Sequence, residues 1–464
     1  MEWLTQLLLP AVQTVNNYLS DYVLLFLLVG TGVFFTLKTG FVQVRCLGEG
    51  LRQVFGGLLH RGQKQESGMS SFQALTTAIA AQVGTGNIVG ASGAILLGGP
   101  GSIFWMWVIA FFGMATVYAE AVLAQKTRTR DENGQVLGGP VYYIRAAFPG
   151  AAGRFLAGFF AVALILALGF LGCMVQSNSI SAAFETAFGI PPWVSGAVLV
   201  VMGGFVMLGG TQRLASVTEK LVPAMAALYL LGGLAVLAAR WQHVGEAFGM
   251  IFRFAFSPQA IVGGSVGAAL KAAVSQGAKR GLFANEAGMG STPHAHALAN
   301  VKTPHQQGCV AMVGVFIGTF SVVTITALVV IVALYAGGGP LHVADSALRA
   351  EALGLNPSNL AQTAYSSVFG QRLGAAFIAI ALFFFAFSTV LSWNLFGKLN
   401  AQYLWGAGAV RPYTLVSLAF LFLGTVISAD LVWGLADLFN QLMVLPNVLG
   451  LLGCAETVKA LTRK

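Results

Sequence analysis

A short run of glycine and polar residues lies at the centre of an otherwise apolar stretch, and the residue types suggest a small polar binding site. Phe72 to Leu97 is long enough to cross a bilayer, yet its centre, Gln82 to Asn87, reads QVGTGN. Glycine weakens a helix, and Thr and Asn side chains compete for its backbone hydrogen bonds. Hydrocarbon tolerates open backbone only where it is buried in protein or lines a cavity, so a break here predicts a binding site at mid-membrane. The alternative is an intact glycine-rich helix packed closely against a neighbour.

A break at this point would offer both signs of partial charge to a ligand. N–H groups at the start of the outer half-helix, from Ile88 onward, would favour an anion such as an amino-acid carboxylate. Carbonyl groups that end the inner half-helix, around Ala81 to Val83, would favour a cation, either sodium or an ammonium group.

The side chains of the break add neutral hydrogen-bonding groups and open space. Gln82, Thr85 and Asn87 carry oxygens and amides suited to a zwitterion, while Gly84 and Gly86 let a ligand approach the backbone. The pattern GTGNIVG is not a dinucleotide fingerprint, because its spacing is GxGxxxG and no strand precedes it.

A second polar cluster interrupts the apolar stretch 373–397. It places adjacent hydroxyls at Ser388 and Thr389, with Trp393 one turn further along. Sodium is a hard ion that prefers oxygen ligands, as calcium and magnesium do, so these hydroxyls could complete a sodium site with carbonyls of the first break. The alternative is that both hydroxyls bond carbonyls of their own helix. Trp393 could form a wall of the binding pocket, or it could pack against neighbouring helices without a role in binding.

Ionisable residues inside apolar stretches are functional candidates. Glu120 lies late in its stretch, where a structural pairing is expected, whereas Asp437 and Lys271 lie deeper. Lys271 could extend to the interface, pair with a carboxylate or replace a bound cation, and the sequence leaves these three roles open.

Cysteine and histidine give little indication of a metal site. The four cysteines are scattered singly with no CxxC pair, so the sequence indicates neither a disulfide framework nor a zinc site. The His294-x-His296 pair and the more distant His305 lie in a polar stretch, and their spacing alone does not predict metal binding.

Composition identifies an integral membrane protein. Of the 464 residues, 56% are hydrophobic and 9% are charged, and the mean hydropathy is +0.77. A soluble domain carries about 25% charged residues. The net charge of +9 could suggest nucleic acid, but Lys and Arg concentrate in alternate loops, which is typical of membrane topology. We therefore expect the lipid bilayer as partner, no nucleic acid and no obligatory protein partner.

The elements that position the two polar clusters are apolar helices. With about 20 residues needed to cross a bilayer, we expect about eleven spans in an all-α fold. Their predicted ranges are 21–37, 71–97, 101–124, 155–186, 193–210, 216–239, 259–281, 307–336, 373–397, 412–428 and 431–453. The loops 38–70 and 125–154 are rich in Lys and Arg, which predicts a cytoplasmic C-terminus and an N-terminus outside.

A second glycine-interrupted span suggests an inverted repeat. Residues 259–281 contain Gly263, Gly264 and Gly267, and this span opens a second set of five that runs antiparallel to the first. Interrupted segments at matching positions in two halves point to the binding site of a secondary transporter. We expect three parts: 1–70 with an interfacial segment, an accessory helix and a cytoplasmic loop; 71–240 as the first repeat; and 241–464 as the second repeat with the tail.

Several motifs, in order along most of the chain, resemble the alanine or glycine:cation symporter family, also called sodium:alanine symporters. They are FQALTTAIAAQVGTGNIVG (72–90), GGPGSIFWMWVIAFFGMAT (98–116), GGPVYYI (138–144), RGLFANEAGMGSTPHAHA (280–297) and FAFSTVLSWN (385–394). Ser102 and Ala284 are small departures from the family pattern, and Lys271 is a larger one.

The resemblance implies a LeuT-like fold of two inverted five-helix repeats and sodium-coupled uptake of alanine or glycine across a bacterial or archaeal plasma membrane. It places substrate contacts on the first break, on the glycines of the second interrupted span and on Thr389 and Trp393. It places sodium at Ala81, Gly84, Ser388 and Thr389, with the ion co-transported.

From the residues and the resemblance together, we expect a secondary transporter that works by alternating access, with sodium as the coupling ion. The predicted site contains no carboxylate, which favours sodium over protons. Proton coupling is the alternative. A channel would need a continuous polar pore or a charged ring, and an intramembrane enzyme would need a nucleophile with a base or metal ligands at depth. Neither pattern is seen in the sequence.

Overall fold

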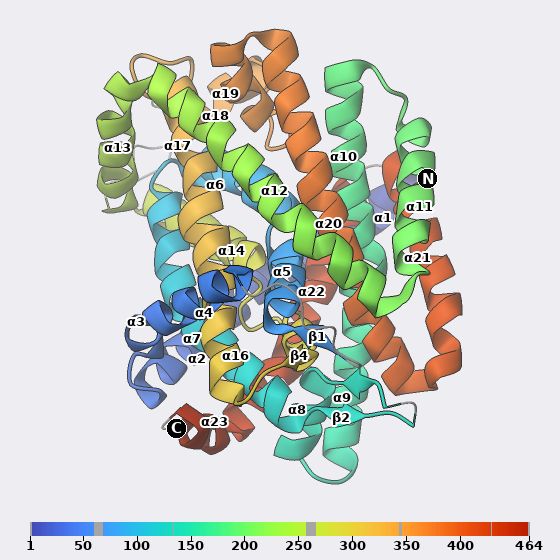
Figure 1. Ribbon diagram of the computed structural model, residues 1–464. Helices are drawn as coiled ribbons and strands as arrows, with labels where there is room; N and C mark the ends of the chain where they lie inside the picture. Colours follow the sequence, from blue (N-terminus) through green and yellow to red (C-terminus); the bar gives the residue numbers. More distant parts are fainter. Residues whose placement is uncertain are drawn as a thin grey trace.

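In a computed structural model, the chain forms a bundle of long apolar helices with short helices and strand pairs at its two ends (Figure 1). The structure describes residues 2–59, 68–132, 134–256, 266–342, 346–427 and 429–462. The N-terminal part contains α1 (Glu2–Tyr18), η1 (Leu19–Leu24), α2 (Leu25–Lys38), α3 (Val42–Arg45), α4 (Leu47–Leu59) and β1 (Met69–Ser70).

The middle of the chain supplies the broken helix and the long helices that surround it. Its elements are α5 (Ser71–Gln82), η2 (Gly86–Gly90), α6 (Ala91–Gly98), α7 (Ser102–Thr127), β2 (Thr129–Arg130), β3 (Val136–Leu137), α8 (Pro140–Ala147), α9 (Ala151–Leu164), η3 (Ile165–Gly172), α10 (Cys173–Phe188), α11 (Pro192–Met207) and α12 (Gly210–Ala239).

The C-terminal part supplies a second series of helices. Its elements are η4 (Trp241–His243), α13 (Val244–Phe256), α14 (Val266–Asn285), α15 (Pro293–Ala297), β4 (Ala299–Asn300), α16 (Pro304–Val315), η5 (Phe316–Val323), α17 (Thr324–Leu334), α18 (Ser346–Ala352), α19 (Leu360–Phe369), α20 (Gln371–Trp405), η6 (Ala407–Ala409), α21 (Val410–Val426), α22 (Ala429–Gly453) and α23 (Ala455–Thr462).

Long apolar helices account for most of the predicted spans. Among the described residues, seven helices are long and apolar enough to cross a membrane, and the bent pair of α5 with η2 and α6 would make eight. The helices α2 and α11 are shorter and apolar and coincide with the predicted spans 21–37 and 193–210. The predicted span 259–281 lies partly outside the described residues, and its described part belongs to α14.

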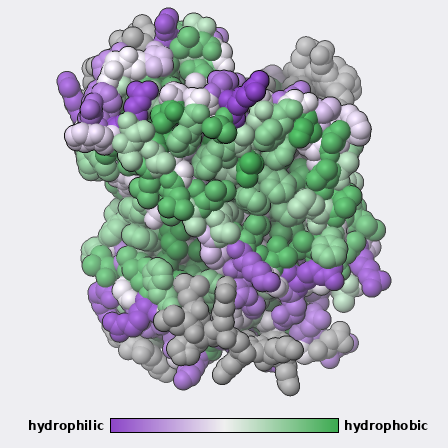
Figure 2. Space-filling model, turned by 45° about the horizontal axis from the view of Figure 1, so that its top comes forward, coloured by the Kyte–Doolittle hydropathy of each residue, from purple (hydrophilic) through white to green (hydrophobic). Residues whose placement is uncertain are grey.

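The outer surface agrees with a membrane environment. In Figure 2, hydrophobic side chains form a belt across the middle of the visible face, and hydrophilic side chains gather above and below it. Large apolar side chains such as Phe155, Val201 and Leu373 are exposed on their helices. In water such a patch would be unfavourable, whereas in a bilayer it contacts lipid.

Two strand pairs and several short helices close one end of the bundle. At the bottom of Figure 1 lie α8, α23 and the two strand pairs, while α13, α18 and α19 lie at the opposite end. Strand β1 pairs in parallel with β4, with Met69 opposite Ala299, and β2 pairs antiparallel with β3. The β1–β4 pair joins the start of the first broken helix to the loop before α16.

The broken helix begins with a defined cap. The Ser70 hydroxyl accepts a hydrogen bond from the Gln73 backbone N–H, and the Gln73 side chain accepts one from the Ser70 N–H, each at 3.0 Å. This reciprocal capping satisfies donors that a helix start leaves unpaired. α5 then runs through the centre of the bundle, in contact with α12, α16 and α20.

Candidate functional site

The predicted break exists, and it lies in the buried centre of the bundle. α5 ends at Gln82, and Val83 leaves the helical region with φ −102° and ψ 79°. Helical structure resumes in η2 at Gly86, and the two halves are bent by 49°. Because the last carbonyls of α5 have no partners within their own helix, they are available to other groups.

Asn87 bonds to the break itself and to η5. Its Oδ1 accepts a hydrogen bond from the Gly84 backbone N–H at 3.2 Å, and its Nδ2 donates to the Gly318 carbonyl in η5 at 3.0 Å. The side chain is completely buried. Asn87 therefore holds the non-helical backbone in place and links it to the second half of the chain.

Gln82 and Thr85 connect the break to two further elements. Gln82 Nε2 donates to the Asn285 carbonyl at the end of α14, at 3.0 Å. The Thr85 backbone N–H donates to Gln176 Oε1 on α10, at 3.2 Å. Each bond fixes one end of the non-helical segment against a different helix.

Three buried polar atoms around the break have no partner within the described part of the chain: Gln82 Oε1, Thr85 Oγ1 and Asn285 Nδ2. Leaving such a group unsatisfied costs about 1–3 kcal/mol. Two acceptors, one of them also a donor, and an amide donor therefore remain available to a small polar ligand.

Thr389 lies directly against the end of α5. Its hydroxyl is 2.8 Å from the Ala80 carbonyl and 2.9 Å from the Phe385 carbonyl of its own helix. A Cβ on Gly84 would lie 2.5 Å from the Thr389 hydroxyl, so the glycine permits this close approach. Hydroxyl and carbonyl oxygens thus meet at the break, and the carbonyl in contact is that of Ala80, which is not among the predicted sodium residues.

Ser388 and Ala81, the other predicted sodium residues, are buried nearby. The Ser388 hydroxyl donates to the Phe385 carbonyl at 2.9 Å and lies 3.4 Å from Met225 Sδ of α12. In this conformation, the Ser388 side chain follows the alternative in which a hydroxyl bonds its own helix.

Trp393 brings a carboxylate to the site. Its Nε1 donates to Glu286 Oε1 at 2.8 Å, and Glu286 Oε2 accepts a hydrogen bond from the Ser291 hydroxyl at 2.5 Å. Its indole ring also lies close to Gly172, where an added Cβ would approach the ring to 2.7 Å. The expectation of a site without carboxylates therefore needs correction, because Glu286 is buried beside a predicted substrate residue.

The second predicted interruption can be followed only at Gly267. Gly263 and Gly264 lie outside the described residues. Gly267 belongs to α14, which continues as a regular helix to Asn285. Non-helical backbone follows at 286–292, with positive φ at Glu286 (54°). The glycines at 288 and 290 permit this turn because their φ values of 81° and 78° favour a residue without Cβ.

The end of α14 lies against the first break. An added Cβ on Gly86 would be 3.0 Å from the Phe283 ring and 3.7 Å from Ala284 Cα. Gln82 reaches the next residue, Asn285, as described above. The residues that meet the first break are therefore Phe283, Ala284 and Asn285, directly before the non-helical segment 286–292.

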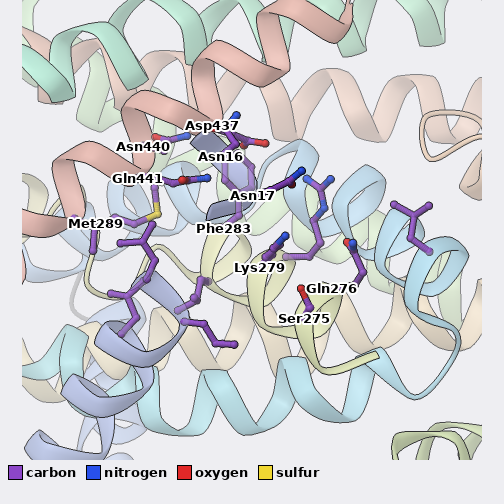
Figure 3. A pocket seen from close by; sticks show the side chains of 17 residues that line it. Asn16, Asn17, Ser275, Gln276, Lys279, Phe283, Met289, Asp437, Asn440 and Gln441 are labelled. Atoms are coloured by element: carbon purple, nitrogen blue, oxygen red, sulfur yellow. The ribbon is translucent and has the colours of Figure 1, made fainter. Parts of the chain in front are cut away.

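A cavity of about 230 Å³ lies beside this contact, between α1, α14 and α22 (Figure 3). Phe283 lines it, and Asp437 faces it near Lys279 and Arg280, whose positive charges act on that carboxylate. The residues of the break do not line this cavity. We place the candidate site at the break because the unpartnered buried polar atoms are there. Phe283 lies between the break and the cavity.

The two remaining ionisable candidates from the sequence are Glu120 and Lys271. Glu120 is buried, and its Oε1 accepts hydrogen bonds from the Gly290 N–H at 3.0 Å and from Asn447 Nδ2 at 2.7 Å. This is the expected structural pairing, although it lies in the interior rather than at an interface. Lys271 is exposed on α14.

His294 and His296 are buried within α15. His294 Nδ1 lies 2.8 Å from the Ser291 carbonyl and its Nε2 lies 2.8 Å from Asn400 Nδ2, while His296 Nδ1 lies 2.8 Å from Gln307 Nε2. Burial lowers the pKa of His294 to about 4 and that of His296 to about 3, so both are neutral at pH 7. They support the local structure, and His305 lies in a different cluster.

Sequence reasoning did not select Gln176, Asn285, Glu286 or Gly318. Gln176 belongs to a short polar run, QSNS, within an apolar span. Asn285 and Glu286 belong to the motif 280–297, which was used only as evidence of the family resemblance. The polar run could have identified Gln176. Gly318 contributes a backbone carbonyl, which leaves no sequence signal.

The fold is similar to that of a solved structure with little sequence similarity to this chain. The crystal structure of MhsT in complex with L-phenylalanine superimposes on this chain with a TM-score of 0.56, covering 86% of this chain and 99% of MhsT at 15% sequence identity. At this identity the comparison shows the fold alone, which is the LeuT-like one.

The sequence then defines the family. A model of the sodium:alanine symporter family matches residues 5–464, and the chain belongs to that family. It is 41% identical over 454 residues to the sodium/alanine symporter AgcS of Methanococcus maripaludis, covering 97% of this chain and 96% of AgcS. It is also 39% identical to Bacillus subtilis YrbD, which is named as a putative sodium/proton-dependent alanine carrier protein, over 96% of this chain and 90% of YrbD.

Proposed function

We propose that this protein is a sodium-coupled symporter that takes small neutral amino acids, alanine or glycine, into the cell by alternating access. The observation that carries the proposal is the contact of the Thr389 hydroxyl with the Ala80 carbonyl beside the break, at 2.8 Å. It brings oxygens from two helices together at the point where backbone hydrogen bonding is interrupted. Such a group of neutral oxygens suits Na⁺.

The substrate would lie in the bend next to this ion. Its carboxylate would accept hydrogen bonds from N–H groups at the start of η2, and Thr85 Oγ1 and Gln82 Oε1 would bond its ammonium group. Both oxygens are buried and without partners within the described residues. Because Thr389 and Phe283 already fill the space beside Gly84 and Gly86, and Trp393 would form a wall, a small amino acid fits the proposal better than a large one.

The proposed architecture is that of about eleven spans, with α2 as an accessory helix and two inverted repeats within 71–240 and 241–464. The protein would lie in a bacterial or archaeal plasma membrane, with its N-terminus outside and its C-terminus in the cytoplasm. The support is the alternation of Lys- and Arg-rich loops, which would lie at the end of the bundle that contains β2, α8 and α23.

Reconstituted transport tests the proposal. Purified protein in proteoliposomes should accumulate radiolabelled alanine when an inward sodium gradient is imposed, and unlabelled alanine should elicit saturable, sodium-dependent counterflow. Liposomes without protein are the control. Flux that does not saturate would indicate a channel, and accumulation driven by a pH gradient without sodium would reverse the choice of ion.

Glu286 supports proton coupling as a second candidate, since a buried carboxylate contacts Trp393 at the site. In that case Glu286→Gln would abolish uptake driven by a pH gradient and keep sodium-independent counterflow. Under sodium coupling, the same variant should still accumulate alanine against a sodium gradient. Measuring both driving forces with one variant distinguishes the two mechanisms.

A further inference from the structure

Four potential metal ligands that are scattered in the sequence meet where α4 packs against α16. Cys46 directly precedes α4, Glu49 lies in the first turn of α4, and His305 and Cys309 lie in the first turns of α16. One donor atom from each of the four lies within 4.8 Å of the others. The cluster is separate from the break on α5, and the proposed transport function does not use it.

The distances in this cluster are close to those of a tetrahedral zinc site. His305 Nε2 is 3.5 Å from Cys309 Sγ and 3.5 Å from Glu49 Oε2. With Zn–N near 2.0 Å and Zn–S near 2.3 Å, neighbouring ligand atoms in a tetrahedron are roughly 3.3–3.8 Å apart. The longest separations in the cluster need a contraction of roughly 1 Å, which side-chain rotation can supply.

The packing of α4 on α16 brings the Cys46–Glu49 pair and the His305–Cys309 pair together. Cys46 and Glu49 are three residues apart, and His305 and Cys309 are four apart on one helix, so each pair shares a face. At the contact, a Cβ on Gly50 would lie 2.3 Å from the Cys309 carbonyl oxygen. Only glycine at position 50 therefore allows α4 to approach α16 this closely.

Neighbouring groups orient the histidine and leave a path for an ion. The Tyr118 hydroxyl lies 2.7 Å from His305 Nδ1, so Nε2 faces Cys309 and Glu49. A bond to the second ring nitrogen is what typically fixes a metal-binding histidine. Both cysteines are buried, whereas the Glu49 side chain is 45% exposed, so an ion can enter from that side.

We propose that Cys46, Glu49, His305 and Cys309 bind one Zn²⁺ ion that clamps α4 to α16. Two thiols and an imidazole select a zinc-like ion over Na⁺, Mg²⁺ or Ca²⁺, which prefer oxygen. The ion replaces the two thiol protons, which are released on binding, and His305 binds through Nε2 in its neutral form. The clamp ties the segment after the accessory helix α2 to the beginning of a helix that borders the transport site.

Zinc binding by the full-length protein in detergent tests the proposal. After chelation, exposure to zinc and gel filtration, the wild type should hold about one zinc ion per chain, whereas Cys46→Ser with Cys309→Ser should hold almost none. Cobalt in place of zinc should give a thiolate-to-metal charge-transfer band in the wild type. The matched control is Cys173→Ser with Cys454→Ser, which removes two buried cysteines outside the cluster and should bind zinc as the wild type does.

Milder variants keep the test valid if the double cysteine variant folds poorly. Glu49→Gln and Tyr118→Phe should each weaken zinc affinity by about 10–100-fold, the first by loss of a charged ligand and the second by loss of His305 orientation. Equal zinc content in the wild type and in the Cys46/Cys309 variant would overturn the proposal. So would cobalt bound without a thiolate band, or a Cys46–Cys309 disulfide in protein purified without added oxidant.

Discussion

At the scale of single residues, Asn87 is the side chain on which the geometry of the break depends most directly. It bonds the Gly84 N–H within the break and the Gly318 carbonyl across the bundle. Asn87→Ala removes both bonds and leaves two buried backbone groups unsatisfied, at about 1–3 kcal/mol for each. We expect alanine binding to be nearly abolished, as measured by titration calorimetry in the presence of sodium.

A matched control for this variant is Asn178→Ala on α10. Asn178 also donates from a partly buried amide to a backbone carbonyl, that of Gly424, but it lies away from the break. This variant should bind alanine with an affinity close to that of the wild type. Wild-type affinity in Asn87→Ala would remove Asn87 from the site.

Thr389 provides the second prediction at this scale. Its hydroxyl reaches the Ala80 carbonyl, whereas the Ser388 hydroxyl contacts Phe385 and Met225. Replacing both with alanine should raise the sodium concentration for half-maximal uptake by about tenfold, equivalent to about 1.4 kcal/mol. The single variants Thr389→Val and Ser388→Ala show which hydroxyl carries the effect. An unchanged sodium dependence in the double variant would place the ion elsewhere.

At the scale of elements, the close contact of α5 with α20 depends on Gly84. An added Cβ there would lie 2.5 Å from Thr389 Oγ1 and 3.2 Å from Gln176 Oε1. Overpacking of this kind costs about 1–3 kcal/mol. Gly84→Ala should therefore lower both the melting temperature and the alanine uptake of the purified protein.

Gly30→Ala on α2 is the control for that change, because no atom lies within 4 Å of its added Cβ. Alanine also favours a helix over glycine by about 1 kcal/mol. The Gly30 variant should be as stable as the wild type or more so. If both variants kept the melting temperature and the alanine uptake of the wild type, tight packing at Gly84 would not be needed for function.

At the scale of the whole molecule, the proposed topology predicts which loops face outward. Glu351 is exposed on α18, and Ala460 is exposed on α23, which lies at the other end of the bundle. A membrane-impermeant maleimide should label Glu351→Cys in intact cells and should label Ala460→Cys only after permeabilisation. The native cysteines are buried, so the wild type serves as the background. The reverse pattern would invert the topology.

The sequence predicted the features that depend on local composition. Glycine, threonine and asparagine within an apolar stretch gave the break between Gln82 and Gly86, because a helix is weakened by residues that lie next to one another in the chain. The resemblance gave the family, which the comparisons confirm. Of the second predicted interruption, Gly263 and Gly264 lie outside the described residues, and Gly267 is helical. An interruption before Val266 stays a prediction.

Local composition therefore determined that this chain is a helical membrane protein with a polar break at the centre of one helix. The tertiary structure alone decided which distant groups complete that break. Gln176 and the backbone carbonyls of Asn285 and Gly318 reach it from helices that are remote in sequence. The same holds for Cys46 and Glu49, which meet His305 and Cys309 because α4 packs on α16 at Gly50. These contacts depend on how whole helices pack against one another, and the spacing of residues along the chain does not determine that packing.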